Sequence, residues 1–171
     1  HSVYQTASAR TANNIPYAVT LSAGLMPPET WPVLVWDASG PVPLATAIPR
    51  AVTAMAALPD GVLVADEGGA IYRFDGVDFH TGALRTGVAI RGLWGTSADD
   101  FWAVGDKGRA WRVVERDVSE VPTGVAADLT GVSGVDGEAG EALSIAAGPH
   151  LLRRQDGAFQ YEMLPSGTRV H

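Results

Sequence analysis

The chain has 171 residues, enough for one domain with a hydrophobic core and too few for two ordinary domains. Apolar residues make up 46% and charged residues 18%, which excludes a disordered chain, while 20 glycines and 11 prolines favour tight turns over long helices. The net charge of −7 argues against a nucleic-acid partner, and the absence of cysteine excludes disulfides and zinc–thiolate sites.

The first part of the chain is expected to hold an arm and one unit of strands. Residues 1–14 are mostly polar and predict an N-terminal arm or a strand that closes a ring. Residues 15–49 predict the first unit because β-branched and aromatic residues recur between proline- and glycine-rich turns. Its strands are expected at 15–22, 31–36 and 42–48.

Three further units follow, each with four short strands. The second unit, 50–87, is expected to have strands at 51–58, 62–65, 70–74 and 77–80, with Asp75-Gly76 as a hairpin turn. The third, 88–127, is expected to have them at 91–94, 101–104, 109–114 and 116–121. The fourth, 128–166, is expected to have them at 129–132, 142–146, 150–154 and 158–163.

The units repeat with a period near 40 residues. ADEGGAIYRF begins at Ala65 and GDKGRAWRVV at Gly105, so the two segments are offset by 105 − 65 = 40. Asp75-Gly76 recurs as Asp156-Gly157, an offset of 156 − 75 = 81. Four short strands per 40 residues predict an all-β fold of the β-propeller type. Either about four blades of four antiparallel strands form a ring, or a partial propeller is completed by another chain.

The best copy carries a recognisable motif. It reads Trp94-Gly-Thr-Ser-Ala-Asp-Asp-Phe-Trp-Ala-Val-Gly105, with Gly108 following. This resembles bacterial tandem-repeat propeller proteins whose blades carry Trp-Gly-x-Ser and then Asp-Val-Trp-Ala-Val-Gly. The resemblance covers residues 50–165 and implies a propeller in an exported bacterial protein with a binding role. It implies no catalytic residue, because the motif is architectural. Asp75-Gly76 and Asp156-Gly157 give a looser likeness to the aspartate-box propellers.

The motif residues have physical roles of their own. Trp94, Trp102 and Trp111 are large apolar side chains suited to packing between neighbouring blades. Asp99 and Asp100 can accept backbone N–H bonds in the turn before the second strand, or could form an acid/base pair; the turn role is favoured.

Candidate contact residues lie on the face where the turns between second and third strands meet the links between blades. These turns predict Asp66, Glu67, Asp106, Lys107 and His150 as binding candidates. The links are expected at 82–87 and 121–127, and ordinary solvated turns are the competing interpretation.

No catalytic residue, metal ligand or cofactor is predicted. The four histidines share no ligand spacing. The acidic run Asp136, Glu138 and Glu141 could hold calcium, but a solvated insertion is favoured.

The sequence therefore predicts a non-catalytic binding or scaffold module with a protein or glycan ligand, outside the cell, at its surface or in the periplasm. No transmembrane segment is expected, since no apolar run reaches the roughly 18 residues that one needs. A homo-oligomer or association with further blades would cover open edges. Two alternatives stay open: a propeller enzyme such as a glycoside hydrolase or lyase, and a β-sandwich carbohydrate-binding domain using Trp31, Trp36 or Trp94 as a sugar platform.

Overall fold

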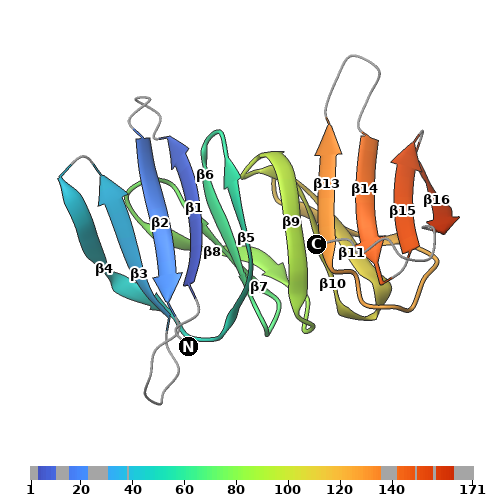
Figure 1. The fold of residues 1–171 in the computed structure, drawn as a ribbon, viewed down its shortest axis with the longest axis horizontal. Coiled ribbons are helices and arrows are strands. Elements are labelled where there is room, and N and C mark those ends of the chain that lie inside the picture. The colour runs from blue at the N-terminus through green and yellow to red at the C-terminus, as the bar shows by residue number, and fades with distance from the viewer. Residues whose placement is uncertain are drawn as a thin grey trace. The chain divides into compact units, whose positions relative to one another are not determined.

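The computed structural model describes residues 4–10, 16–22, 31–37, 39–135, 142–148, 150–155 and 157–163. The predicted all-β class is confirmed: these residues form four antiparallel sheets of four strands each (Figure 1). The helical structure within the described ranges is a single 3-10 turn, η1 (Asp106–Gly108). No helix in these ranges is long and apolar enough to cross a membrane.

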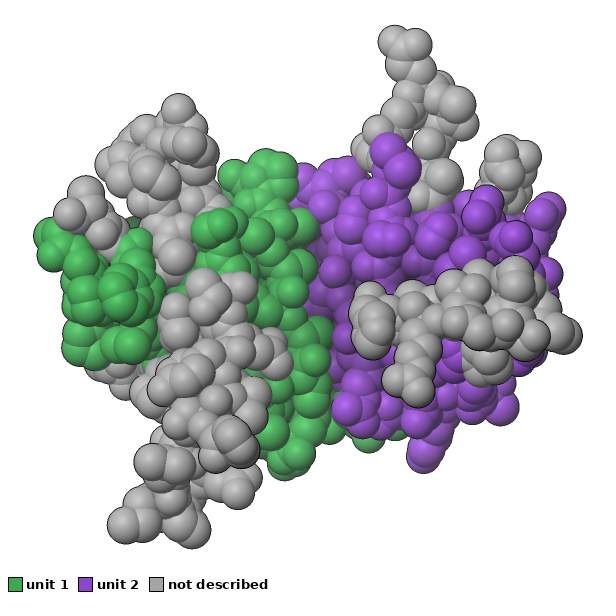
Figure 2. Space-filling model, viewed as in Figure 1, with its two compact units in different colours: residues 1–89 green, residues 90–171 purple. Residues whose placement is uncertain are grey.

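The chain divides into two compact units, His1–Ala89 and Ile90–His171 (Figure 2). The first contains sheet A, with β1 (Tyr4–Arg10), β2 (Pro16–Ser22), β3 (Trp31–Asp37) and β4 (Gly40–Ile48), and sheet B, with β5 (Val52–Leu58), β6 (Gly61–Asp66), β7 (Ala70–Phe74) and β8 (Phe79–Arg85). The second contains sheet C, with β9 (Ile90–Ser97), β10 (Asp100–Gly105), β11 (Arg109–Val114) and β12 (Asp117–Pro122), and sheet D, with β13 (Gly131–Val135), β14 (Ala142–Ala147), β15 (His150–Gln155) and β16 (Ala158–Met163).

Each sheet is a meander in which consecutive strands are hydrogen-bonded neighbours. Residues Tyr4–Arg10, expected as an arm or closing strand, form β1 and pair with β2. The alanine-rich segment before Pro59 is strand β5, as predicted, because its side chains alternate between buried and partly exposed along most of its length.

Two predicted strands begin too early. The first strand of sheet D was expected at 129–132 and is β13, which runs from Gly131 to Val135. The fourth strand of sheet B was expected at 77–80, and instead β8 runs from Phe79 to Arg85. The carboxylate of Asp75 accepts the backbone N–H groups of Val77 and Asp78, at 2.9 and 3.0 Å, and so keeps both residues in the turn. The strand therefore begins later and occupies part of the segment that was predicted as a link.

Within each unit the two sheets pack face to face. In the first unit Val19, Val33 and Ile48 of sheet A share one buried cluster with Val62 and Phe74 of sheet B. We call the side of sheets A and C that packs on the other sheet of the same unit the front face, and the side of sheets B and D that packs there the back face. The opposite side of each sheet takes the other name. The front face of sheet A thus contacts the back face of sheet B.

The second unit repeats the front-to-back arrangement. Val104 and Ala110 of sheet C cluster with Ile145 and Leu152 of sheet D. Trp102, predicted to lie between neighbouring sheets, is 1% exposed and meets Phe159 of β16 edge to face, with ring centroids 6.3 Å apart.

The hairpin registers revise the offset between sheets B and C. Ala65 pairs with Ile71, and Val104 pairs with Ala110, so five residues separate the partners in both hairpins. Superposing these pairs gives an offset of 104 − 65 = 39, not the 40 that the sequence suggested. Gly69 and Gly108 then coincide, and both have positive φ, 79° and 68°.

The Asp75 turn gives a prediction on pH. Hydrogen bonds from the Asp78 and Val77 backbone, with His80 beside them, lower the pKa of Asp75 from 3.8 to about 2. A lowered folded pKa means that the stabilisation is present above about pH 4 and is lost as the pH falls towards 2. We expect urea unfolding midpoints between pH 5 and 2 to fall more steeply for the native chain than for Asp75→Asn. Parallel curves would contradict this.

Candidate functional site

The offset of 39 places different residues at equivalent positions in the turns that follow β6 and β10. Glu67 is equivalent to Asp106, and Gly68 is equivalent to Lys107. Asp66 is equivalent to Gly105, so Asp66 and Asp106 are not counterparts. The predicted candidates must therefore be considered turn by turn.

Asp66 serves the turn of sheet B. It is 1% exposed, and its Oδ1 accepts the N–H groups of Gly68 and Ala70, both at 2.9 Å. Its Oδ2 accepts the hydroxyl of Tyr72 at 3.0 Å. Burial, and then the bond to Asp66, raises the pKa of Tyr72 to about 12, so this hydroxyl stays a donor at neutral pH. Asp66 is a buried structural acceptor.

Glu67 is the exposed residue of the same turn. Its backbone N–H donates to the carbonyl of Ala51 at 2.9 Å. Gly68 lies under the side chain of Arg50, whose Cδ would be 3.0 Å from a Cβ at position 68. This places an acidic and a basic residue near the end of sheet B without an ion pair between them in the described contacts.

The turn of sheet C is organised around an ion pair. Asp106 receives Arg91 Nε at 2.8 Å and a second guanidinium nitrogen at 3.2 Å, one on each carboxylate oxygen. The bond from Arg91 lowers the pKa of Asp106, and the bond to Asp106 raises that of Arg91. Both side chains are partly exposed. The pair therefore stays charged and presents its free edges to solvent.

Arg91 is at a position where sheets B and D carry threonine. It lies between Ile90 and Gly92, at an irregularity in the pairing of β9 with β10, as Thr53 does between Val52 and Ala54 in sheet B. Thr53 donates to the carbonyl of Ala65, and Thr130 donates to that of Ala146, both at 3.4 Å. Arginine at this position reaches beyond the local carbonyl to Asp106.

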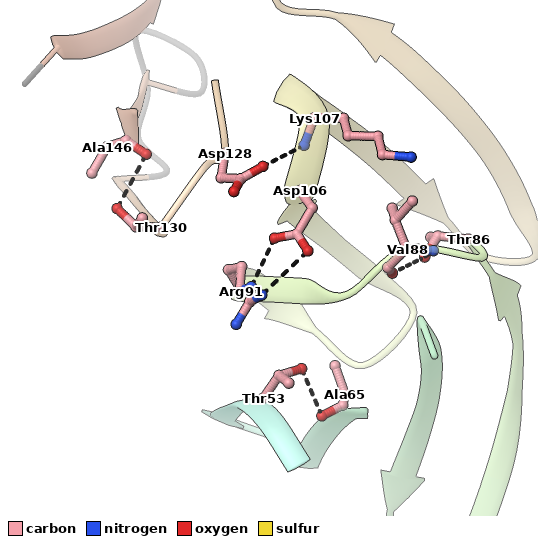
Figure 3. A network of polar contacts seen from close by, with 10 residues as sticks. All are labelled: Thr53, Ala65, Thr86, Val88, Arg91, Asp106, Lys107, Asp128, Thr130 and Ala146. Carbon is pink, nitrogen blue, oxygen red and sulfur yellow. Dashed lines mark hydrogen bonds and ion pairs between the residues drawn. The ribbon is translucent and has the colours of Figure 1, made fainter. Parts of the chain in front are cut away.

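Asp128 holds the same turn from the following link. Its Oδ1 accepts the backbone N–H of Lys107 at 2.8 Å, as Asp66 accepts that of the equivalent Gly68. Because Gly105 supplies no carboxylate, Asp128 takes over that role. Figure 3 shows Asp128 on the link, with its carboxylate at the Lys107 backbone nitrogen, and Asp106 on the turn, with the Lys107 ammonium directed away from both carboxylates.

Lys107 has a left-handed backbone, with φ 61° and ψ 29°. Non-glycine residues adopt this conformation at a cost of about 1–2 kcal/mol. Gly68, the equivalent residue of sheet B, does not have a left-handed backbone. The exposed Lys107 is therefore held in a strained conformation by the turn and by Asp128. We call Arg91, Asp106, Lys107 and Asp128 the sheet C turn cluster.

A threonine fixes each turn to the segment after the outer strand. The hydroxyl of Thr123 donates to the carbonyl of Gly108 at 2.6 Å, and that of Thr86 lies 3.4 Å from the carbonyl of Gly69. Both threonines precede a glycine and a valine. These Thr-Gly-Val segments, which the sequence prediction missed as a signal, position the turns.

Among the described contacts, His150 has none with the sheet C turn cluster. It begins β15, and its ring lies against Tyr161, with centroids 4.6 Å apart. Asp99 and Asp100 behave as turn residues: the carbonyl of Asp99 accepts the Glu115 N–H, and Asp100 pairs with Arg112. The acidic run at Asp136, Glu138 and Glu141 lies outside the described residues. Across the described ranges, no group of three or more His, Asp or Glu could hold a metal ion.

Of the predicted candidates, the structure brings Asp106 and Lys107 together and adds Arg91 and Asp128. The signal for Arg91 was its alignment with threonines, which requires the correct register. Compared with known proteins, the chain matches no family model and no curated protein.

Proposed function

We propose that the chain is a β-propeller, or part of one, that acts as a non-catalytic binding or scaffold module of an exported bacterial protein. Three features support the propeller: the common strand order of the four sheets, the front-to-back packing inside each unit, and the recurring threonine bonds. The Trp-Gly-x-Ser resemblance supports the bacterial setting.

The sheet C turn cluster is the proposed contact surface. The observation that supports this proposal is the backbone of Lys107. This exposed cation has a left-handed conformation, whereas Gly68, the equivalent residue of sheet B, does not. Backbone strain of this kind concentrates at functional sites. The neighbouring Arg91–Asp106 pair offers both donors and acceptors. This combination suits a polar ligand that itself has hydrogen-bond donors and acceptors, such as a glycan or an extended peptide.

Lys107→Gly separates binding from stability. Relief of the left-handed strain is expected to raise the free energy of unfolding by about 0.5–1 kcal/mol after the added chain entropy of glycine is counted. The same substitution removes the cation and should abolish binding. Urea unfolding measures the first effect, and arrays of glycans and synthetic peptides probed with the labelled protein measure the second.

Glu115→Gly is the matched control. Glu115 also has a positive φ, 56°, but it lies in the turn between β11 and β12, at the other end of sheet C. Its replacement should stabilise the fold by a similar amount and leave every array signal unchanged. Signals that survive Lys107→Gly as well as they survive Glu115→Gly would refute the assignment of the surface.

A further inference from the structure

Sheet A has an exposed apolar back face. In β3, Leu34 and Trp36 alternate with the front-face residues Val33 and Val35. Leu34 pairs with Pro43 and Trp36 with Pro41, so all four side chains lie on the same face. Trp36 is 44% exposed, and both prolines are exposed. The equivalent back faces of sheets B and D are buried against the sheet before them.

Sheet D has an exposed front face. The pairing of β14 with β15 puts Ala146 opposite Leu151, on the side away from Ile145 and Leu152. Val135 of β13, 71% exposed, lies on the same side. Arg153 is also there, exposed and paired with Glu162 at 3.1 Å. This face combines small apolar side chains with a cation.

The contact between sheets C and D contains a stacked tryptophan and arginine within front-to-back packing. There, Trp102 on the front face of sheet C lies under Arg154 from the back face of sheet D, with the guanidinium carbon 4.9 Å from the ring. The back face of sheet A and the front face of sheet D offer the same two groups with the faces exchanged, since Trp36 lies on a back face and Arg153 on a front face. Stacking of arginine on tryptophan is favourable when both lose water.

We infer that the back face of sheet A in one copy binds the front face of sheet D in a second copy, with Trp36 against Arg153. Each copy carries both faces, so the two contacts of a two-fold dimer are equivalent: the back face of sheet A in each copy binds the front face of sheet D in the other. This inference rests on front-to-back packing and needs no ligand at the sheet C turn cluster.

The mass of the native particle tests the dimer. Sedimentation or light scattering should give twice the 17.9 kDa of the chain, with dissociation on dilution. Trp36→Glu should raise the dimer dissociation constant at least about 30-fold, as expected for a central interface residue. Val77→Glu places the same charge at a side chain that is 71% exposed in the β7–β8 turn, and it should leave the dimer intact. Circular dichroism confirms that each variant is folded.

A mixing experiment tests the pairing of faces. Trp36→Glu and Arg153→Glu should each be monomeric. When mixed, they should form a heterodimer that retains one native contact between the intact back face of one copy and the intact front face of the other. A particle of single-chain mass at every concentration would overturn the inference. A native dimer that Trp36→Glu leaves unchanged would overturn it as well.

Discussion

Trp102→Ala is expected to lower the free energy of unfolding by about 3–5 kcal/mol, the largest effect that we expect from truncating any one side chain of the described residues. Trp102 is 1% exposed and is the largest of the fully buried side chains. Its ring contacts Phe159, and the guanidinium carbons of Arg112 and Arg154 lie 5.5 and 4.9 Å from its centroid. Alanine would remove the ring from between two sheets and leave a cavity bordered by two cations.

Trp102→Phe distinguishes lost volume from lost ring chemistry. Phenylalanine keeps an aromatic face for Arg154 but fills less space, so its cost should lie well below that of alanine. Chemical unfolding followed by circular dichroism measures both variants. If alanine costs less than about 1 kcal/mol, Trp102 does not hold sheets C and D together, and the front-to-back packing of the second unit must be reconsidered.

Much of the fold could be predicted because its signals are local. The bounds of β7, β11 and β16 agree with the sequence prediction, since alternating apolar residues and glycine or Asp-Gly turns mark those hairpins. Strand β8 could not be placed in the same way. Whether Val77 begins a strand depends on which backbone amides the Asp75 carboxylate binds. The same amino-acid sequence is compatible with several such hydrogen-bond patterns.

The candidate site was predicted only in part because it depends on register. Alignment of identical residues pairs Asp66 with Asp106, but the strand register of the two hairpins makes Glu67 the residue equivalent to Asp106. With that one-residue correction, Asp66 becomes a buried turn acceptor. Arg91 matches Thr53 only through the pairing of the first strands with the second strands, where the offset is 91 − 53 = 38. Asp128, 21 residues beyond Lys107, could not be assigned to the turn without coordinates.

Gly108→Ala is expected to be the second most damaging change, because two separate costs add at this residue. Its φ of 68° lies in the left-handed region, which costs an alanine about 1–2 kcal/mol. A Cβ there would also collide with the carbonyl oxygen of Val125 and lie 2.7 Å from its carbonyl carbon. Forcing backbone apart in a packed region costs about 1–3 kcal/mol more.

Gly124→Ala isolates the first cost. Gly124 has a similar φ of 78°, lies in the Thr-Gly-Val segment that contacts this turn, and has open space around the position of a Cβ. Its substitution should cost only the conformational strain, so the difference between the two variants measures the collision with Val125. Because Thr123 binds the carbonyl of Gly108, Gly108→Ala should also loosen that link, and amide hydrogen exchange at Lys107 should rise. Equal stability of the two variants would show that the turn of sheet C can move away from the link, and that Asp128 and Thr123 do not fix the position of Lys107.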